Sequence, residues 1–140
     1  MRINRGVAYI TLALLMSGCG IFGRGHGNRW NTSPLLSAAE GRARFSITKN
    51  DNTHLVLKFK NLGLPEELTP PSVSYVVWVR ADKRSPAQNI GALKINNDFT
   101  GELDAETPLH SFEVFITVES SGQIQKPTGE HLLWTTYRRQ

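Results

Sequence analysis

The feature that most constrains this chain is the two-residue period of its apolar side chains in the segment after residue 40. Ala43, Phe45 and Ile47 alternate with polar residues, and residues 54–60 repeat this pattern beyond an Asn/Asp-rich turn. A period of two is typical of a β-strand with one buried face, because successive side chains point to opposite faces of a sheet. The two segments therefore predict a β-hairpin.

Turn signals separate five further apolar segments, at residues 73–80, 90–95, 99–103, 112–119 and 131–137. The first of these is apolar on both faces, which predicts the most covered strand of the fold. A single sheet cannot bury its own inner face, so seven short strands without a long helical pattern predict two packed sheets. We expect an all-β, seven-stranded antiparallel immunoglobulin-like sandwich over residues 41–140. A small closed barrel is the alternative.

The N-terminus carries the features of a secretory signal. Arg2 and Arg5 precede an apolar run at residues 7–16, which is followed by small residues. A run of about ten residues is half of what a bilayer core of ~30 Å requires. A charged start, a short apolar stretch and small residues at its end predict a signal peptide and not a permanent membrane helix.

The tripeptide Ser17-Gly18-Cys19 resembles the lipobox of bacterial lipoproteins, although Met16 stands where a leucine is more usual. The resemblance implies that residues 1–18 are a lipoprotein signal peptide and that Cys19 carries lipid on its sulfur. Two acyl chains would hold the protein stably on a membrane. Gly20, in place of an aspartate, implies a cell-envelope location at the periplasmic leaflet of the outer membrane if the source is Gram-negative. An ordinary signal peptide with a chance cysteine is the alternative.

Residues 19–40 are predicted to be the lipidated cysteine and a flexible tether. Gly20, Gly23, Gly25 and Gly27 alternate with polar and basic residues. Such a chain behaves as a flexible coil that spans roughly 25 Å over ~20 residues. The tether therefore allows the folded part to move above the membrane surface.

The composition limits the possible partners. The formal charge is +4, and removal of Arg2 and Arg5 with the signal lowers it to about +2. The remaining basic residues are scattered, and export from the cytoplasm argues against a nucleic-acid partner. Cys19 is the only cysteine, so no disulfide within the chain is expected and the core alone must hold the domain together.

Searches for catalytic and metal-binding motifs find none in the sequence. It has neither a Gly-rich phosphate loop nor a Gly-x-Ser-x-Gly elbow, and its four histidines lack ligand spacing. The acidic pairs Glu66-Glu67 and Asp104/Glu106 fall in predicted turns, where carboxylates are usually solvated. We therefore predict a protein that is not an enzyme and that holds no metal or cofactor.

Aromatic residues on the outer face of a sandwich can stack on sugar rings or enter a partner's groove. Phe115 is the best candidate for such exposure, because Glu113 and Thr117 share its face. Trp78 is a second candidate, although it shares its face with Val76, which favours the core. Phe115 and Trp78 are therefore the predicted contact surface.

Five short segments carry a family resemblance: residues 75–80 (YVVWVR), 91–93 (GAL), 99–103 (FTGEL), 112–119 (FEVFITVE) and 127–129 (PTG). In this order they resemble the C-terminal extracytoplasmic domain of anti-sigma-K factors, over about residues 73–135. None of these segments is catalytic. The resemblance implies a β-sandwich in the cell envelope.

Anti-sigma-K factors combine this domain with a membrane-spanning helix and a cytoplasmic zinc-binding domain that sequesters the sigma factor. The present sequence shows no zinc motif and no spanning segment, so sequestration by that mechanism is not expected. The resemblance implies a sensing or protein-contact module on the membrane that binds an envelope protein. The alternative is a module that binds carbohydrate or peptidoglycan through outward aromatic residues.

Overall fold

The computed structural model describes residues 29–64 and 74–140, so Cys19 and the predicted signal peptide lie outside the described residues. No helix among the described residues is long and apolar enough to cross a bilayer. One 3-10 turn, η1 (Pro34–Leu36), accompanies the strands. The strands are β1 (Asn31–Thr32), β2 (Glu40–Ile47), β3 (Thr53–Lys60), β4 (Ser74–Arg80), β5 (Gln88–Ala92), β6 (Lys94–Ile95), β7 (Gly101–Thr107), β8 (Ser111–Glu119) and β9 (Leu133–Arg138).

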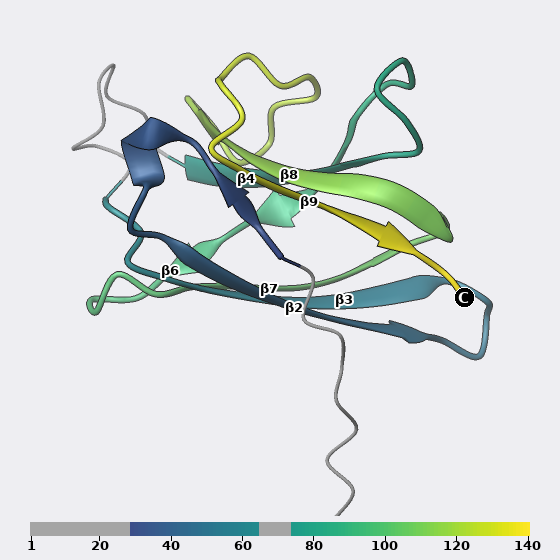
Figure 1. The fold of residues 1–140 in the computed structure, drawn as a ribbon. Coiled ribbons are helices and arrows are strands. Elements are labelled where there is room, and N and C mark those ends of the chain that lie inside the picture. Colours follow the sequence, from purple (N-terminus) through teal and green to yellow (C-terminus); the bar gives the residue numbers. More distant parts are fainter. Residues whose placement is uncertain (1–28, 65–73) are drawn as a thin grey trace, which may run out of the picture.

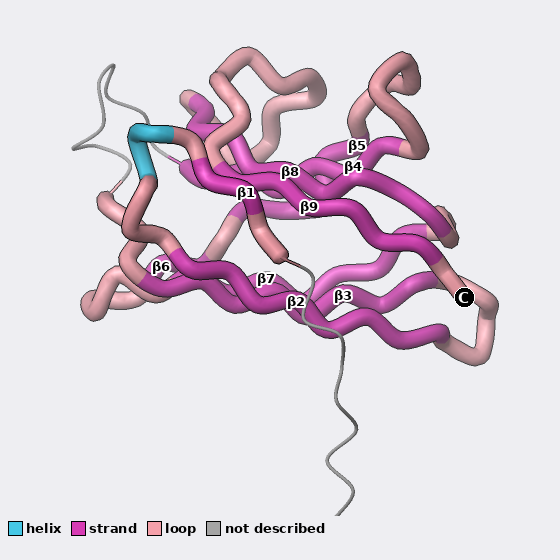
Figure 2. Tube along the Cα trace, viewed as in Figure 1, coloured by secondary structure: helices cyan, strands magenta, loops and turns pink. Residues whose placement is uncertain are grey.

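The strands form two antiparallel sheets that lie face to face (Figures 1 and 2). One sheet has five strands in the order β1-β9-β8-β4-β5, and the other has four strands in the order β2-β3-β7-β6. The predicted hairpin is β2–β3, with Phe45 opposite Leu55. The predictions of an all-β fold, two packed sheets and this hairpin are confirmed.

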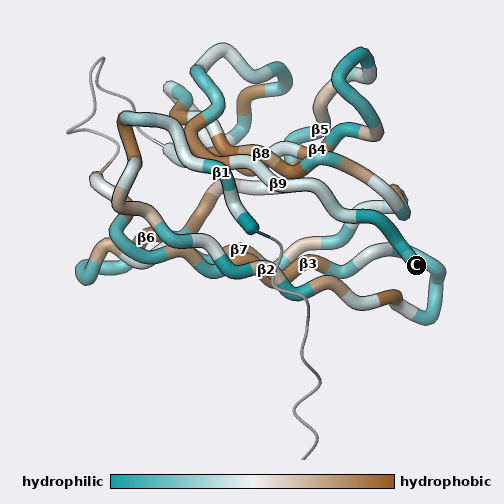
Figure 3. Tube along the Cα trace, in the orientation of Figure 1, coloured by the Kyte–Doolittle hydropathy of each residue, from teal (hydrophilic) through white to brown (hydrophobic). Residues whose placement is uncertain are grey.

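The main core lies between the two sheets. Leu55, Leu57 and Phe59 point inward from β3 and are at most 1% exposed. Residues 75–79 of β4 are all buried, which confirms that this strand is covered on both faces. Much of β4 and β8 is hydrophobic, whereas the surface loops are hydrophilic (Figure 3). Strands covered on both faces lose the alternation of apolar and polar residues.

The described part of the chain has nine strands, not the seven predicted. The segment predicted as one strand at residues 90–95 is two strands in different sheets. Its first half pairs with β4, and its second half, β6, pairs with β7. The chain crosses between the sheets at Leu93, which is only 7% exposed and whose amide donates to the Tyr75 carbonyl over 2.8 Å.

The ninth strand lies in the segment predicted to be tether. Thr32 of β1 pairs with Leu133 of β9, and Leu36 and Ala39 are each 6% exposed. The Trp30 ring packs edge-on against a core phenylalanine ring at a centroid distance of 4.8 Å. The predicted boundary at residue 40 is therefore wrong, since the fold includes residues from Trp30 onward. The polar composition of this segment concealed the few apolar side chains that anchor it.

Candidate functional site

The outer face of the five-stranded sheet carries the predicted contact surface. Phe115 of β8 lies opposite Trp78 of β4 on one side and Trp134 of β9 on the other, so the three form a row across the sheet. Trp78 and Phe115 are both 0% exposed, and Trp134 is half-buried. The prediction that Phe115 is exposed is therefore wrong, whereas the burial of Trp78 agrees with the core position that its face favoured. These two rings offer no flat platform to a ligand.

Side chains from neighbouring segments cover Phe115. The His131 ring stacks on the Phe115 ring at a centroid distance of 4.0 Å, and the Arg80 guanidinium carbon lies 4.8 Å from its centroid. A guanidinium over an aromatic face is held by the ring quadrupole as well as by packing. With Val76, Trp78 and Phe115, the loop residues Ala87 and Ile124 form a second apolar cluster outside the main core. Loops after β4 and β8 thus convert an outward face into a covered one.

The loop between β8 and β9 is attached to this face through side chains at both ends. Asn89 of β5 donates from its amide nitrogen to the carbonyls of Gly122 (3.0 Å) and Ile124 (2.8 Å). At its other end, the loop amides of Thr128 (2.9 Å) and Gly129 (3.1 Å) donate to Oε1 of Glu119. These hydrogen bonds fix residues 120–132, the cover loop, over the aromatic row.

Glu119 is a buried carboxylate at the centre of a hydrogen-bond network. It is 1% exposed and also accepts hydrogen bonds from the hydroxyls of Thr117 and Thr128, each over 2.5 Å. Trp78 donates from its indole nitrogen to the Thr117 hydroxyl over 2.8 Å. Burial raises the pKa of Glu119, but the hydrogen bonds from Thr117, Thr128 and Gly129 outweigh this and lower the pKa below its ordinary value. A lowered pKa keeps the side chain ionised at neutral pH.

This network joins three of the segments that carried the family resemblance, at residues 75–80, 112–119 and 127–129. All three segments help to hold the cover loop against the sheet, so their role in this network is structural. The sequence interpretation did not single out Glu119. The sequence signal for it is the Thr-Val-Glu triplet at the end of β8, followed within ten residues by Pro-Thr-Gly. The hydroxyls and backbone amides of these segments can donate to a carboxylate that becomes buried when the loop folds back.

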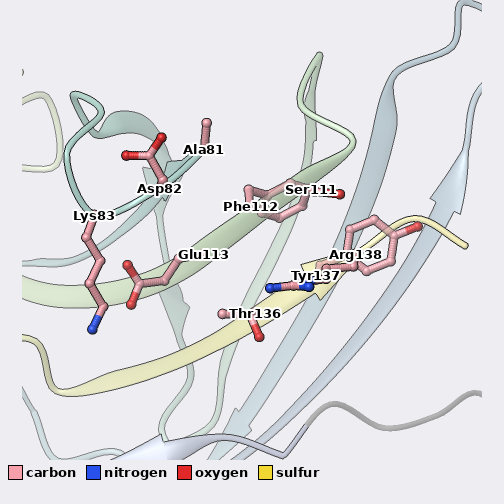
Figure 4. A pocket seen from close by; sticks show the side chains of 9 residues that line it. All are labelled: Ala81, Asp82, Lys83, Ser111, Phe112, Glu113, Thr136, Tyr137 and Arg138. Atoms are coloured by element: carbon pink, nitrogen blue, oxygen red, sulfur yellow. The ribbon is translucent and has the colours of Figure 1, made fainter.

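A shallow pocket of about 480 Å³ opens on the same face, beside the loop after β4 and the ends of β8 and β9 (Figure 4). Its lining includes Glu113, whose carboxylate accepts from Nε of Arg80 over 2.5 Å. Both of these side chains are largely buried, so this carboxylate is committed to an ion pair. Close by, burial lowers the pKa of His131, Arg80 lowers it further, and Glu113 acts in the opposite direction. The ion pair between Arg80 and Glu113 suits a structural role.

The described residues contain no group of three His, Cys, Asp or Glu side chains that could hold a metal ion. Glu66 and Glu67 lie outside the described residues. Asp104 was predicted in a turn but lies in β7, which extends to Thr107, and its carboxylate is 2.7 Å from Nε2 of His54. This pair lies on the solvent face of the four-stranded sheet, so the expectation that Asp104 is solvated agrees with its 74% side-chain exposure.

The edge of the four-stranded sheet presents a different kind of surface. β2 is eight residues long, and β3 is its only strand neighbour within the described chain. Arg42 and Arg44 point to its solvent face and are exposed, with no ion pair to another described residue. On the next strand, Lys58 pairs with Glu102 over 3.2 Å. The exposed face of the outermost strand therefore carries Arg42 and Arg44, without an ion pair to a described residue, and one acidic residue, Glu40, so its net charge is positive.

The β2–β3 turn determines which backbone groups of β2 are unpaired. The Thr48 amide donates to the Asn52 carbonyl over 2.9 Å, which makes these two residues a hydrogen-bonded pair. In an antiparallel ladder such pairs alternate with non-hydrogen-bonded pairs. Counting back along β2, the residues that point their N–H and C=O groups away from β3 are Gly41, Ala43, Phe45 and Ile47. The edge thus presents a row of available backbone donors and acceptors.

Comparisons of the chain with protein-family models, with curated proteins and with solved structures gave no match. The features available to indicate function are therefore the two surfaces described above. One is an aromatic face covered by a loop, and the other is the edge strand β2, which carries exposed arginines and has β3 as its one strand neighbour over residues 29–64 and 74–140.

Proposed function

We propose that this chain is a non-enzymatic, lipid-anchored protein of the bacterial cell envelope that binds another protein through the edge of β2. The observation that carries the proposal is this eight-residue edge, which has no strand neighbour on its open side in the described part of the chain. Addition of an extended segment to an exposed sheet edge is a recurrent mode of protein recognition. Natural sandwiches usually shorten or cover their edges, as the two-residue strand β6 does at the opposite edge of the same sheet.

The buried aromatic residues favour a protein partner over a glycan. A sugar-binding platform needs exposed aromatic faces, and Trp78 and Phe115 are 0% exposed under His131, Arg80 and the cover loop. The alternative function, binding of carbohydrate or peptidoglycan, depended on exposure of these two rings and is therefore disfavoured.

The strand order supports assigning the sandwich to the immunoglobulin-like class. In a constant-type immunoglobulin domain, strands A-B-E-D form one sheet and strands C, F and G form the other. The order β2-β3-β7-β6 corresponds to A-B-E-D, and β4, β8 and β9 correspond to C, F and G. β5 and β1 are then additions at the two edges of the second sheet. The resemblance to the extracytoplasmic domain of anti-sigma-K factors is consistent with this assignment, without implying sequestration of a sigma factor.

The anchor is tested by replacing Cys19 with alanine in the full chain. The variant should lose labelling by an alkyne fatty acid and appear in the soluble fraction, because the thiol is the group that accepts the lipid. Labelling and fractionation of the unchanged protein provide the reference. A variant that stays on the membrane without label contradicts the lipoprotein assignment and the envelope attachment that follows from it.

The contact function is tested by photocrosslinking in intact cells. A photoreactive benzoylphenylalanine at Ser46, on the solvent face of β2, should give a discrete adduct that disappears when Ala43 is changed to proline. The matched control is the same group at Ser111, which is also exposed but lies on β8, a strand with neighbours on both sides. Adducts of equal intensity at both positions, or at neither, would count against β2 as the contact edge.

A further inference from the structure

We infer that the occupant of the β2 edge is an extended protein segment in which acidic and apolar residues alternate. The inference rests on the proposed contact function of β2 and adds the chemistry of the partner. It uses three features of the edge: the direction of its unpaired backbone groups, the charge of its outer side chains and the character of its inner ones.

The backbone determines how such a segment would lie. Gly41, Ala43, Phe45 and Ile47 point their peptide groups away from β3 and would pair with an added strand. Because the side chains of an added strand continue the two faces of the sheet, alternate residues would lie beside Arg42 and Arg44, and the others would face the space between the sheets. The partner must therefore satisfy two different surfaces with a period of two.

The outer surface favours carboxylates. Arg42 and Arg44 are exposed, their neighbours on β3 are Lys58 and Val56, and no acidic residue lies across from them on that strand. The acidic residues of β7 lie beyond β3, about 10 Å from β2 at the usual strand spacing. A strand on the open side of β2 would place its own carboxylates about 5 Å from each arginine, within range of charge-assisted hydrogen bonds.

The inner surface favours apolar side chains. Phe45 is half-buried, and its ring stacks on Tyr137 of β9 at a centroid distance of 4.3 Å. Ile47 is 39% exposed, although it belongs to the inward-pointing set of β2. Apolar residues of an added strand would cover these groups at the open side of the sandwich, removing their remaining surface from water.

A second copy of the chain fits the edge less well. Among antiparallel self-pairings of β2 that keep the inward and outward faces matched, the two with the greatest overlap are centred on Ala43 and on Arg44, and in both arginine lies opposite arginine. Like charges directly opposite each other destabilise a strand pair. The same two residues thus disfavour self-association and favour an acidic partner, which is how charge selects between competing partners.

The test uses fluorescent eight-residue peptides and the full chain in detergent micelles. A peptide of alternating glutamate and valine should bind, as measured by fluorescence anisotropy, and a peptide of alternating lysine and valine should not. Arg44→Glu should weaken binding of the acidic peptide about tenfold at low salt and by less at high salt. The matched control, Lys94→Glu, makes the same charge change on β6 and should leave the affinity unchanged.

A second pair of variants separates charge from backbone pairing. Ala43→Pro removes an outward N–H and should abolish binding, whereas Arg42→Glu with Arg44→Glu should reverse the preference toward the basic peptide. Each variant is first compared with the unchanged chain by thermal melting, so that binding is scored only in folded protein. If Ala43→Pro does not fold, the reversal of preference by the arginine variants decides the question.

Equal binding of both peptides, or acidic binding that survives Arg44→Glu, overturns the inference. Dimerisation that Ala43→Pro abolishes also overturns it, because the occupant is then a second copy. If the Ser46 crosslink forms in cells while the acidic peptide fails to bind, the contact function stands and the acidic partner falls. If neither is observed, both proposals fall.

Discussion

Val77→Asp should unfold this protein. Val77 is 0% exposed at the middle of β4, where it pairs with Gly91 on one side and Ile116 on the other. A carboxylate at this position would be buried between the sheets without a partner, which costs more than about 4 kcal/mol. Since small domains are stable by only about 5–15 kcal/mol, we expect the cooperative melting transition followed by circular dichroism to be lost or strongly lowered.

The matched control for this substitution is Val56→Asp. Val56 is half-buried on the solvent face of β3, opposite Arg44 on β2. The same chemical change there leaves the carboxylate in water, between Arg44 on β2 and Asp104 on β7, whose charges act in opposite directions, so it should alter stability by much less. A Val77→Asp variant that melts cooperatively near the temperature of the unchanged protein would show that β4 is not central to the core.

Glu119→Ala should produce the second-largest loss of stability. The substitution would leave four buried or partly buried donors without their acceptor: the hydroxyls of Thr117 and Thr128 and the amides of Thr128 and Gly129. Unpaired donors of this kind cost about 1–3 kcal/mol each where water cannot reach them. We expect a total loss of about 3 kcal/mol in urea denaturation, since the loop can move toward water.

Two comparisons isolate the role of the charge at Glu119. Glu119→Gln keeps the shape and part of the acceptor capacity, so it should lose less stability than Glu119→Ala. Glu130→Ala, an exposed position in the same loop, should change stability by less than about 0.5 kcal/mol. Equal effects at Glu119 and Glu130 would contradict the view that the buried carboxylate holds the loop.

The lowered pKa of Glu119 also gives a pH dependence with a defined sign. Because its pKa is lower in the folded than in the unfolded chain, its contribution is fully present above about pH 4.3, the ordinary glutamate value. The contribution is lost as the pH falls through the lowered pKa of the folded state. The stability difference between the unchanged protein and Glu119→Gln should therefore shrink on acidification.

The interior of the fold could be predicted because its signals are local. Phe45, Leu55 and Leu57 follow a period of two, and the turn between them is rich in Asn and Asp, so the hairpin and its buried face follow from neighbouring residues alone. The burial of strand β4 on both faces is predicted by apolar residues at every position from Tyr75 to Val79. Such patterns exist wherever one strand must bury the same face along its whole length.

The functional surfaces could be predicted only in part, because they depend on segments distant in the chain. Phe115 alternates with polar residues and was expected at the surface, but His131, Arg80 and a loop ending more than ten residues later cover it. Glu119 looks like a solvated strand end in the sequence and is 1% exposed in the fold. No local pattern records a contact that forms when a loop folds back on a sheet.

By itself, the sequence determined the all-β class, the inward faces of the principal strands and the expectation of a lipid anchor at Cys19, all from patterns within a few residues. Only the tertiary structure decided that the chain changes sheets at Leu93 and that residues from Trp30 onward join the fold. It also decided that β2 lies at the edge of its sheet among the residues that the structure describes. The physical reason is that strand order and loop coverage depend on pairing between segments distant in the chain. The free energy of that pairing and packing outweighs the local conformational preference of any short segment.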